Sequence, residues 1–200
     1  MTVSGAKRTR PAMFTLTPDK LVRFAPGVEI GDFDCGDGDL NEFLRDDAKT
    51  YLAELLSVTY LIMDEKRVAA FFSLSNDKLT CAPDEDGTKT TWNRLQRGIP
   101  NKKRRRSYPA VKIGRLGVCA DMQCVGLGRQ ILDWLKMLFL TANRTGCRFI
   151  TVDAYNNPRT LGFYERNDFR FLTSADEKDD TRQMYFDLKP FADLMTATPR

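Results

Sequence analysis

The sequence predicts one α/β domain in which helices flank a mixed central sheet. Apolar strand-like segments alternate with amphipathic helical segments over the 200 residues. At its centre, residues 110–154 read as a strand, a glycine-rich turn, a long helix and another strand, an order typical of α/β folds. The composition, 42% hydrophobic and 29% charged, is that of an ordinary globular protein with a sizeable core.

The first elements are a short strand at 20–26 and a helix at 40–56. Asp39 is the expected N-cap of this helix, with Glu42 three residues later as in a capping box. The helical spacing of the apolar residues predicts one amphipathic face, made of Leu40, Phe43, Leu44, Ala48, Tyr51, Leu52, Leu55 and Leu56.

A hairpin follows, with strands at 57–63 and 68–74 that are rich in β-branched and aromatic residues. Residues 76–107 then lose periodicity and contain Pro83, Gly87, Gly98 and Pro100. We expect an insertion or long connection there, with a short helix near 91–96, and such connections usually carry function or mobility.

The central unit begins with a strand at 110–119 and continues with a helix at about 126–144. The apolar face of this helix is broad, which predicts that it presses onto the sheet. Gly146 is the expected C-terminal stop of the helix. An apolar strand at 149–154 completes the unit.

The last elements are a short helix and two closing strands. Asn157 is the expected cap of the helix, Pro158 occupies its first position, and it ends near Asn167, a residue type that tolerates the left-handed conformation. The strands are expected at 169–172 and 183–188.

The expected organisation is a basic leader at 1–19, a domain at 20–190 and a tail at 191–200. No segment approaches the ~20 apolar residues that span a bilayer, and the leader lacks an apolar signal core, so we expect a cytoplasmic protein without membrane contact. The cysteines are odd in number and form no CxxC pair, which fits a reducing compartment: Cys35, Cys81, Cys119, Cys124 and Cys147.

The chain contains no histidine, which excludes His-containing zinc sites, Ser-His-Asp triads and Cys-His dyads. We therefore expect no metal. The net charge is +4, and its one dense basic run is Lys102, Lys103, Arg104, Arg105 and Arg106. This run is either a solvated loop or a contact for a phosphate-rich partner such as nucleic acid.

Gly126 and Gly128 precede the long helix and leave backbone N–H groups exposed at its start. A helix N-terminus carries about half a positive charge and unpaired donors, which suits it to phosphate groups. A tight strand-to-helix turn explains the glycines equally well on spacing alone.

Two motifs resemble the GNAT superfamily of acetyl-CoA-dependent N-acetyltransferases. Gln123, Gly126 and Gly128 match its Gln/Arg-x-x-Gly-x-Gly/Ala motif, after a strand that ends at 115–118. Asn156-Asn157-Pro158 and the segment 162–169 resemble its short helix ending Phe-Tyr-Glu-x-x-Gly-Phe, with Asn167-Asp168 in place of the usual glycine turn. The resemblance covers about 110–189 and implies a mostly antiparallel sheet, acetyl-CoA as co-substrate and direct acetyl transfer to a primary amine.

A narrower resemblance lies upstream. Residues 33–36, 40–44 and Ala48, together with 113–116, are similar to the GNAT toxins of bacterial toxin–antitoxin pairs. That resemblance implies aminoacyl-tRNA as the amine acceptor and an antitoxin protein as a partner. This chain is longer than those toxins, contains the segment 76–107, and has Val-Cys-Ala-Asp at 118–121 where that group often has Val-Asp.

The resemblance implies a role for each site residue. Tyr164 is the expected general acid, because a phenol with a pKa of about 10 is protonated at neutral pH; a half-buried helix aromatic is the structural alternative. A backbone N–H near Val118 would stabilise the oxyanion. The expected CoA-binding residues are Leu116, Gly117, Val118, Gln123, Cys124, Val125, Gly126, Leu127, Gly128, Arg129 and Asn157.

The sequence leaves several points open. With no histidine, the general base is a carboxylate, a water chain or absent, and a base-free site suits an α-amine of pKa about 8 better than a lysine of about 10.4. A module that binds CoA or nucleic acid without turnover is the alternative function, although Tyr164 and the two intact glycines favour an enzyme. The acceptor and the oligomeric state, for which a homodimer is one candidate, stay open.

Overall fold

A computed structural model describes residues 14–80 and 88–197 of the chain. Its seven strands form one sheet in the order β1-β2-β3-β4-β5-β7-β6. Every neighbouring pair is antiparallel except β4 and β5, which confirms the predicted mixed, mostly antiparallel sheet. The strands are β1 (Leu21–Arg23), β2 (Val58–Asp64), β3 (Arg67–Thr80), β4 (Ser107–Val118), β5 (Phe149–Tyr155), β6 (Arg170–Phe171) and β7 (Thr181–Asp187).

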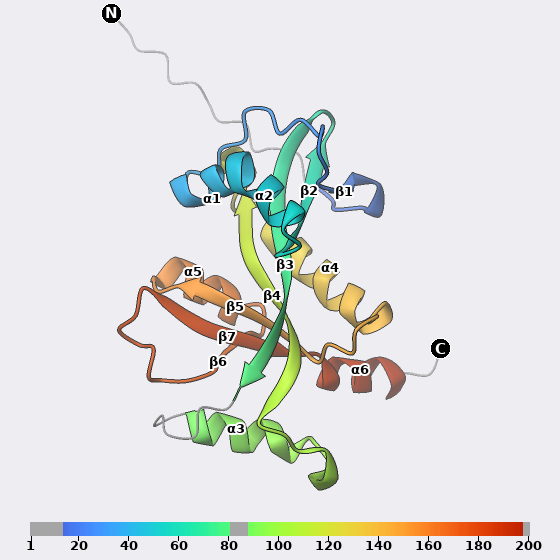
Figure 1. The fold of residues 1–200 in the computed structure, drawn as a ribbon, viewed down its shortest axis with the longest axis vertical. Helices are drawn as coiled ribbons and strands as arrows, with labels where there is room; N and C mark the ends of the chain where they lie inside the picture. Colours follow the sequence, from blue (N-terminus) through green and yellow to red (C-terminus); the bar gives the residue numbers. More distant parts are fainter. Residues whose placement is uncertain (1–13, 81–87, 198–200) are drawn as a thin grey trace, which may run out of the picture.

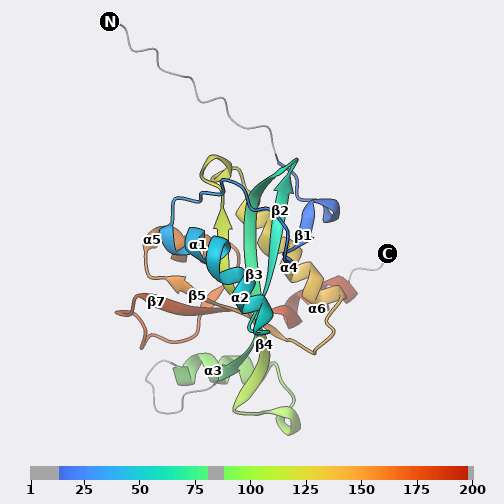
Figure 2. The same cartoon turned by 45° about the horizontal axis from the view of Figure 1, so that its top comes forward.

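Helices lie on both faces of this sheet (Figure 1). Figure 2 shows α1 and α2 in front of β2 and β3, with α4 behind them. The helices are α1 (Gly38–Glu42), α2 (Ala48–Ala53), α3 (Thr88–Arg97), α4 (Leu127–Thr141), α5 (Pro158–Glu165) and α6 (Leu188–Ala197). A π-helical turn, Phe43–Asp47, joins α1 to α2, so the predicted continuous helix exists with an irregular centre.

Three apolar clusters hold the helices to the sheet. The largest contains Ile131 of α4 and Tyr164 of α5 and packs them against the β4–β5–β7 face. A second cluster lies under α1 and α2 on the opposite face and is centred on Phe71. A third places Trp92 of α3 against Tyr108, with ring centroids 5.3 Å apart. The sheet is therefore covered unevenly, and β3 is the strand that all three clusters share.

The segment 76–107 is more ordered than predicted. β3 continues to Thr80 and pairs with β4 from Ser107 onwards, so the two strands extend as a long antiparallel ladder. The prediction missed this part of β3 because Asn76 and Lys78 are exposed polar residues on a strand with one uncovered face. The predicted short helix is α3, and it is longer than 91–96; Pro83 lies outside the described residues.

The predicted helix ends are only partly correct. Asp37, not Asp39, caps α1, because its side chain accepts the Leu40 N–H at 3.1 Å. Asn157 caps α5 as predicted and accepts the Thr160 N–H at 2.9 Å. α4 ends at Thr141, well before Gly146, and after α5 the left-handed residue is Asp168 rather than Asn167.

The C-terminal residues of the described chain form α6, which begins inside the predicted domain and includes 191–197 of the predicted tail. Phe191 of this helix packs against Phe186 of β7, with ring centroids 4.8 Å apart. None of the helices in the described ranges is long and apolar enough to cross a membrane. Most of the predicted leader, residues 1–13, lies outside the described residues.

Candidate active-site cleft

The cleft forms where the two parallel strands separate. β4 pairs with β5 only from Ala110 to Ile113, yet β4 runs on to Val118 and β5 to Tyr155. A bulge at Gly114 in the β3–β4 ladder lies at the point of separation. The space between the diverging strands is a cleft of about 970 Å³, lined by β4, β5, the first turns of α4 and α5, and the N-terminal end of α1.

The open edge of β4 presents unpaired backbone groups to this cleft. Cys119 donates its N–H to the Ala69 carbonyl at 2.9 Å, which makes Val118 and Ala70 a non-hydrogen-bonded pair. Because the pattern alternates along an antiparallel ladder, the backbone groups of Val118 and Leu116 point away from β3. The Val118 carbonyl accepts Gln123 Nε2 at 2.9 Å. The Leu116 N–H and carbonyl and the Val118 N–H are left to pair with an extended ligand.

The N-terminus of α4 opens into the same cleft. Gly126 is its N-cap with φ of +89°, and no side chain caps the helix. No acidic residue occupies the first turn, so the free N–H groups of Leu127 and Gly128 keep their positive field. A Cβ on Gly128 would lie 3.2 Å from the Phe163 ring, so glycine lets α4 and α5 approach closely. The glycines thus make both a tight turn and a helix end with free donors, an arrangement that suits anions.

The Gln123 side chain forms hydrogen bonds with three different segments. Its Nε2 donates to the carbonyls of Cys35 at 2.7 Å and Val118 at 2.9 Å, and its Oε1 accepts Arg159 at 2.7 Å. The side chain is therefore occupied by protein partners. Sequence reasoning missed Arg159, although an arginine in the first turn of a helix with no acidic residue there is a detectable signal.

Tyr164 lies in α5 and is 5% exposed. Its ring packs edge-on against Phe163 and Phe169, with centroids 5.1 and 5.3 Å away. Burial raises the pKa of its hydroxyl, so the group stays protonated over the physiological range. The residue lines the cleft, and among the described residues none forms a hydrogen bond with its hydroxyl. Tyr164 is thus a packed aromatic residue whose hydroxyl is protonated at neutral pH.

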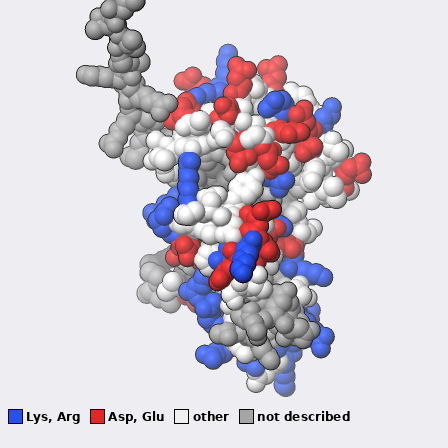
Figure 3. All heavy atoms as spheres, turned by 90° about the vertical axis from the view of Figure 1, so that its left-hand side faces the viewer, with Lys and Arg blue, Asp and Glu red and all other residues white. Residues whose placement is uncertain are grey.

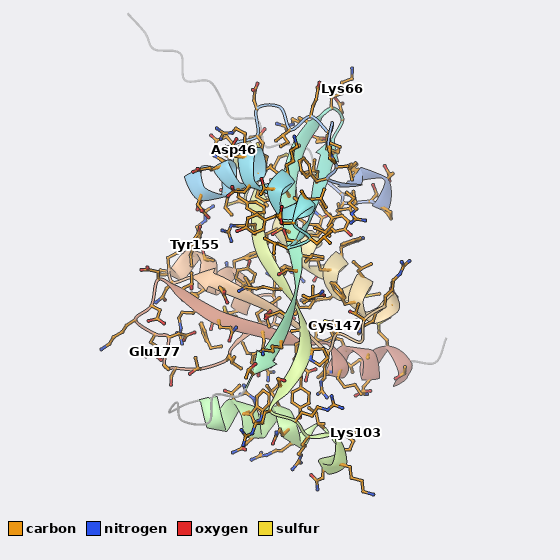
Figure 4. All side chains as sticks on the ribbon, viewed as in Figure 1. Asp46, Lys66, Lys103, Cys147, Tyr155 and Glu177 are labelled. Atoms are coloured by element: carbon orange, nitrogen blue, oxygen red, sulfur yellow. The ribbon has the colours of Figure 1, made fainter. Side chains whose placement is uncertain are left out.

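A polar cluster that the sequence did not predict lies at the α1 end of the cleft. The Asp39 carboxylate accepts the Tyr155 hydroxyl at 3.1 Å and lies 3.5 Å from Arg115 Nε. Tyr155 stands at the end of β5 (Figure 4). Desolvation and the nearby Asp37 and Asp39 charges raise the pKa of Tyr155 to about 12. Nearer the paired part of the strands, Lys112 forms an ion pair with Asp153.

The basic run lies away from the cleft. Its residues are exposed beside α3, and none of them lines the cavity. Figure 3 shows Lys and Arg side chains around this end of the molecule and Asp and Glu side chains toward the α1 end. Arg104 has a structural use, because its Nε donates to the carbonyls of Gln96 at 3.1 Å and Ile99 at 3.3 Å. The other four side chains extend into solvent.

The structure therefore brings most predicted site residues together. Val125 does not line the cleft, and the side chain of Asn157 is used as a helix cap. No group of three or more potential metal ligands occurs in the described part of the chain. The predicted residues that line the cleft are Leu116, Gly117, Val118, Gln123, Cys124, Gly126, Leu127, Gly128, Arg129, Asn157 and Tyr164.

Comparison with known proteins gives fold neighbours at low sequence identity. No protein-family model matches the chain. A tyrosine-to-phenylalanine mutant of the toxin AtaT has a TM-score of 0.69 and 18% identity, and the match covers 94% of this chain and 99% of that one. AtaT complexed with acetyl-methionyl-tRNAfMet gives 0.69 and 19%, over 88% and 98%. The KacTA–DNA complex gives 0.64 and 20%, over 89% and 98%. The chain therefore has the GNAT-like fold of toxins from toxin–antitoxin systems.

Proposed function

We propose that this protein is an N-acetyltransferase that moves an acetyl group from acetyl-CoA to a primary amine. One observation carries the proposal: an unpaired strand edge, a helix N-terminus and the Tyr164 hydroxyl open into a single cleft. These groups match three parts of acetyl-CoA. The strand edge can pair with the extended pantetheine arm, the helix N-terminus can bind the pyrophosphate, and the hydroxyl can protonate the leaving thiolate.

The residues present fit acetyl-CoA. The N–H groups of residues 126–129 would hold the pyrophosphate, since they are fixed donors with no competing acid in the first turn. The free backbone groups of Leu116 and Val118 would pair with the pantetheine arm as an added strand does. Arg159 needs only to leave the neutral Gln123 amide to reach a phosphate.

In the proposed reaction the acceptor nitrogen attacks the thioester carbon, so a C–N bond forms and the C–S bond breaks. The Val118 N–H donates to the developing oxyanion. Tyr164 gives its proton to the departing thiolate and is reprotonated from solvent. The nitrogen loses its extra proton to water, a step that needs no enzymic base when the amine is an α-amine of pKa about 8.

We propose aminoacyl-tRNA as the acceptor and an antitoxin as a protein partner, with the reaction in the cytoplasm. AtaT, a fold neighbour, has been solved with acetyl-methionyl-tRNAfMet and, separately, with the C-terminus of its antitoxin AtaR. The exposed basic side chains beside α3 support this acceptor, because they give an RNA backbone a contact outside the cleft.

The test is acetyl transfer from labelled acetyl-CoA to a pool of charged tRNAs, with spermidine and a lysine peptide in parallel reactions. Label on the α-amino group of aminoacyl-tRNA is the expected result. Label on spermidine or the peptide alone supports the acetyltransferase but refutes the acceptor. CoA binding without acetyl transfer to any of these amines refutes the acetyltransferase and supports the alternative, a module that binds CoA without turnover.

The contact with RNA has its own test. Changing Lys102, Lys103, Arg105 and Arg106 to alanine leaves the carbonyl contacts of Arg104 in place. If each lost cation contacts one phosphate, the slope of log affinity for tRNA against log salt falls by about 0.7–0.9 per contact. An unchanged slope would make the run a solvated loop.

A further inference from the structure

Elements on both faces of the sheet line the cleft; its part beside α4 and α5 is called the α4–α5 opening, and its part beside α1 is called the α1 opening. α4 and α5 pack on one face and α1 and α2 on the other, yet residues of all these regions except α2 line the same cavity. The α4–α5 opening carries Arg129, Arg159 and Arg166. The α1 opening carries the carboxylates of Asp37 and Asp39. Phosphates fit the first opening, and the second is left for the acceptor.

Asp39 joins both walls of the second opening. One of its partners, Arg115, belongs to β4, and the other, Tyr155, belongs to β5, the two strands that diverge around the cleft. Asp39 itself lies in the first turn of α1. Its Oδ2 receives both contacts, at 3.5 and 3.1 Å, so the carboxylate is fixed across the opening by two separate elements.

The second carboxylate oxygen is free to bind a ligand. Among the described residues, none donates a hydrogen bond to Asp39 Oδ1, and the side chain is 60% exposed. Arg115 is committed elsewhere: its NH1 donates to the Gly114 carbonyl at 3.0 Å and its guanidinium lies over the Phe43 ring at 5.2 Å. Its Nε is buried without a hydrogen bond, so the arginine holds Asp39 by charge at modest strength. Asp39 can therefore retain its position while it accepts a new donor.

We infer that the acceptor approaches from the α1 face and that its primary amine donates an N–H to Asp39, with Arg115 and Tyr155 as positioning residues. This inference rests on the proposed acetyl transfer and assigns the acceptor subsite of that reaction. An amine held at this opening meets the thioester from the side opposite the cofactor phosphates. A carboxylate fixed on both walls is a suitable acceptor for an ammonium or amine N–H.

The test is steady-state kinetics of Asp39→Asn with two probes, a charged tRNA pool and methionine methyl ester, which share an α-amine next to an ester. Replacing the carboxylate by an amide weakens one charge-assisted hydrogen bond, so KM for both probes is expected to rise about tenfold. The dissociation constant for CoA, measured by calorimetry, is expected to stay within twofold. Asp39→Glu, which keeps the carboxylate, is expected to recover part of the loss.

Glu42→Gln is the matched control, since Glu42 is an exposed acid of the same helix that does not line the cleft. Tyr155→Phe removes one support of Asp39 and is expected to raise KM by less than Asp39→Asn does. An acceptor KM of Asp39→Asn within twofold of wild type, with transfer intact, overturns this inference alone. Wild-type protein that transfers no acetyl to either probe overturns the proposed aminoacyl-tRNA acceptor as well, and protein that also transfers none to spermidine or the lysine peptide overturns the proposed acetyltransferase.

Discussion

Gly117 packs against the buried ring of Phe71, so its replacement by alanine has a cost that can be worked from the structure. A Cβ at this position would lie 2.5 Å from Phe71 Cε1, about 1 Å inside ordinary carbon–carbon contact. Phe71 is 0% exposed and is held by Phe33 at 5.4 Å and by Phe43 at 6.1 Å between ring centroids. The ring has no free direction in which to move.

Overpacking of this kind costs about 1–3 kcal/mol. For a domain of this size, about 2 kcal/mol lowers Tm by about 4–8 °C. Scanning calorimetry of Gly117→Ala measures the shift. Gly38→Ala is the matched control, because a Cβ there has no neighbour within 4 Å, and its Tm is expected to stay within about 1 °C of wild type. A Tm for Gly117→Ala as high as that of the control would refute the packing argument.

Three further predictions concern the cleft. Tyr164→Phe is expected to lower kcat by at least about 100-fold with unchanged Tm, since the hydroxyl has no hydrogen-bond partner among the described residues; a full rate would refute the proposed role of Tyr164 as the acid. Arg159→Ala is expected to weaken CoA binding about tenfold by calorimetry, whereas the exposed control Arg144→Ala is expected to leave the affinity unchanged. Equal CoA affinities of the two variants would show that Arg159 does not contact the phosphates. Because burial raises the pKa of Tyr164, this acid stays protonated as pH rises. A plot of kcat/KM against pH is therefore expected to rise through the pKa of the acceptor amine and not to fall below about pH 9. A fall in kcat/KM below that pH would show that another group is the acid.

The features that sequence reasoning predicted are those with local signals. The α4 helix has a broad apolar face and follows two glycines, and α5 begins with the Asn157 cap and Pro158, so neighbouring residues alone define both. The strand–turn–helix–strand order then restricts the topology to an α/β sheet. The helix end of the proposed cofactor site follows from these elements, because its groups are backbone N–H groups after two glycines, whereas the roles of Leu116, Val118 and Tyr164 were expected only from the resemblance to the GNAT superfamily.

The proposed acceptor subsite could not be predicted because its contacts join distant segments. Asp39 and Tyr155 are 116 positions apart, and Asp39 read locally as a helix cap, a role that Asp37 takes. Gln123 matched a motif position, but its side chain reaches Cys35, 88 positions away. Neither contact leaves a periodic signal. These polar side chains meet because β4 diverges from β5, which only the three-dimensional structure reveals.

In the proposed reaction, acetyl-CoA binds along the separated edge of β4. Backbone amide exchange measured by NMR, before and after addition of CoA, tests this placement most directly. The N–H groups of Leu116 and Val118 are expected to become protected, whereas that of Gly117, already directed at β3, is expected to change little. Tight CoA binding with no new protection at Leu116 and Val118 would contradict the proposed placement of CoA on this strand edge.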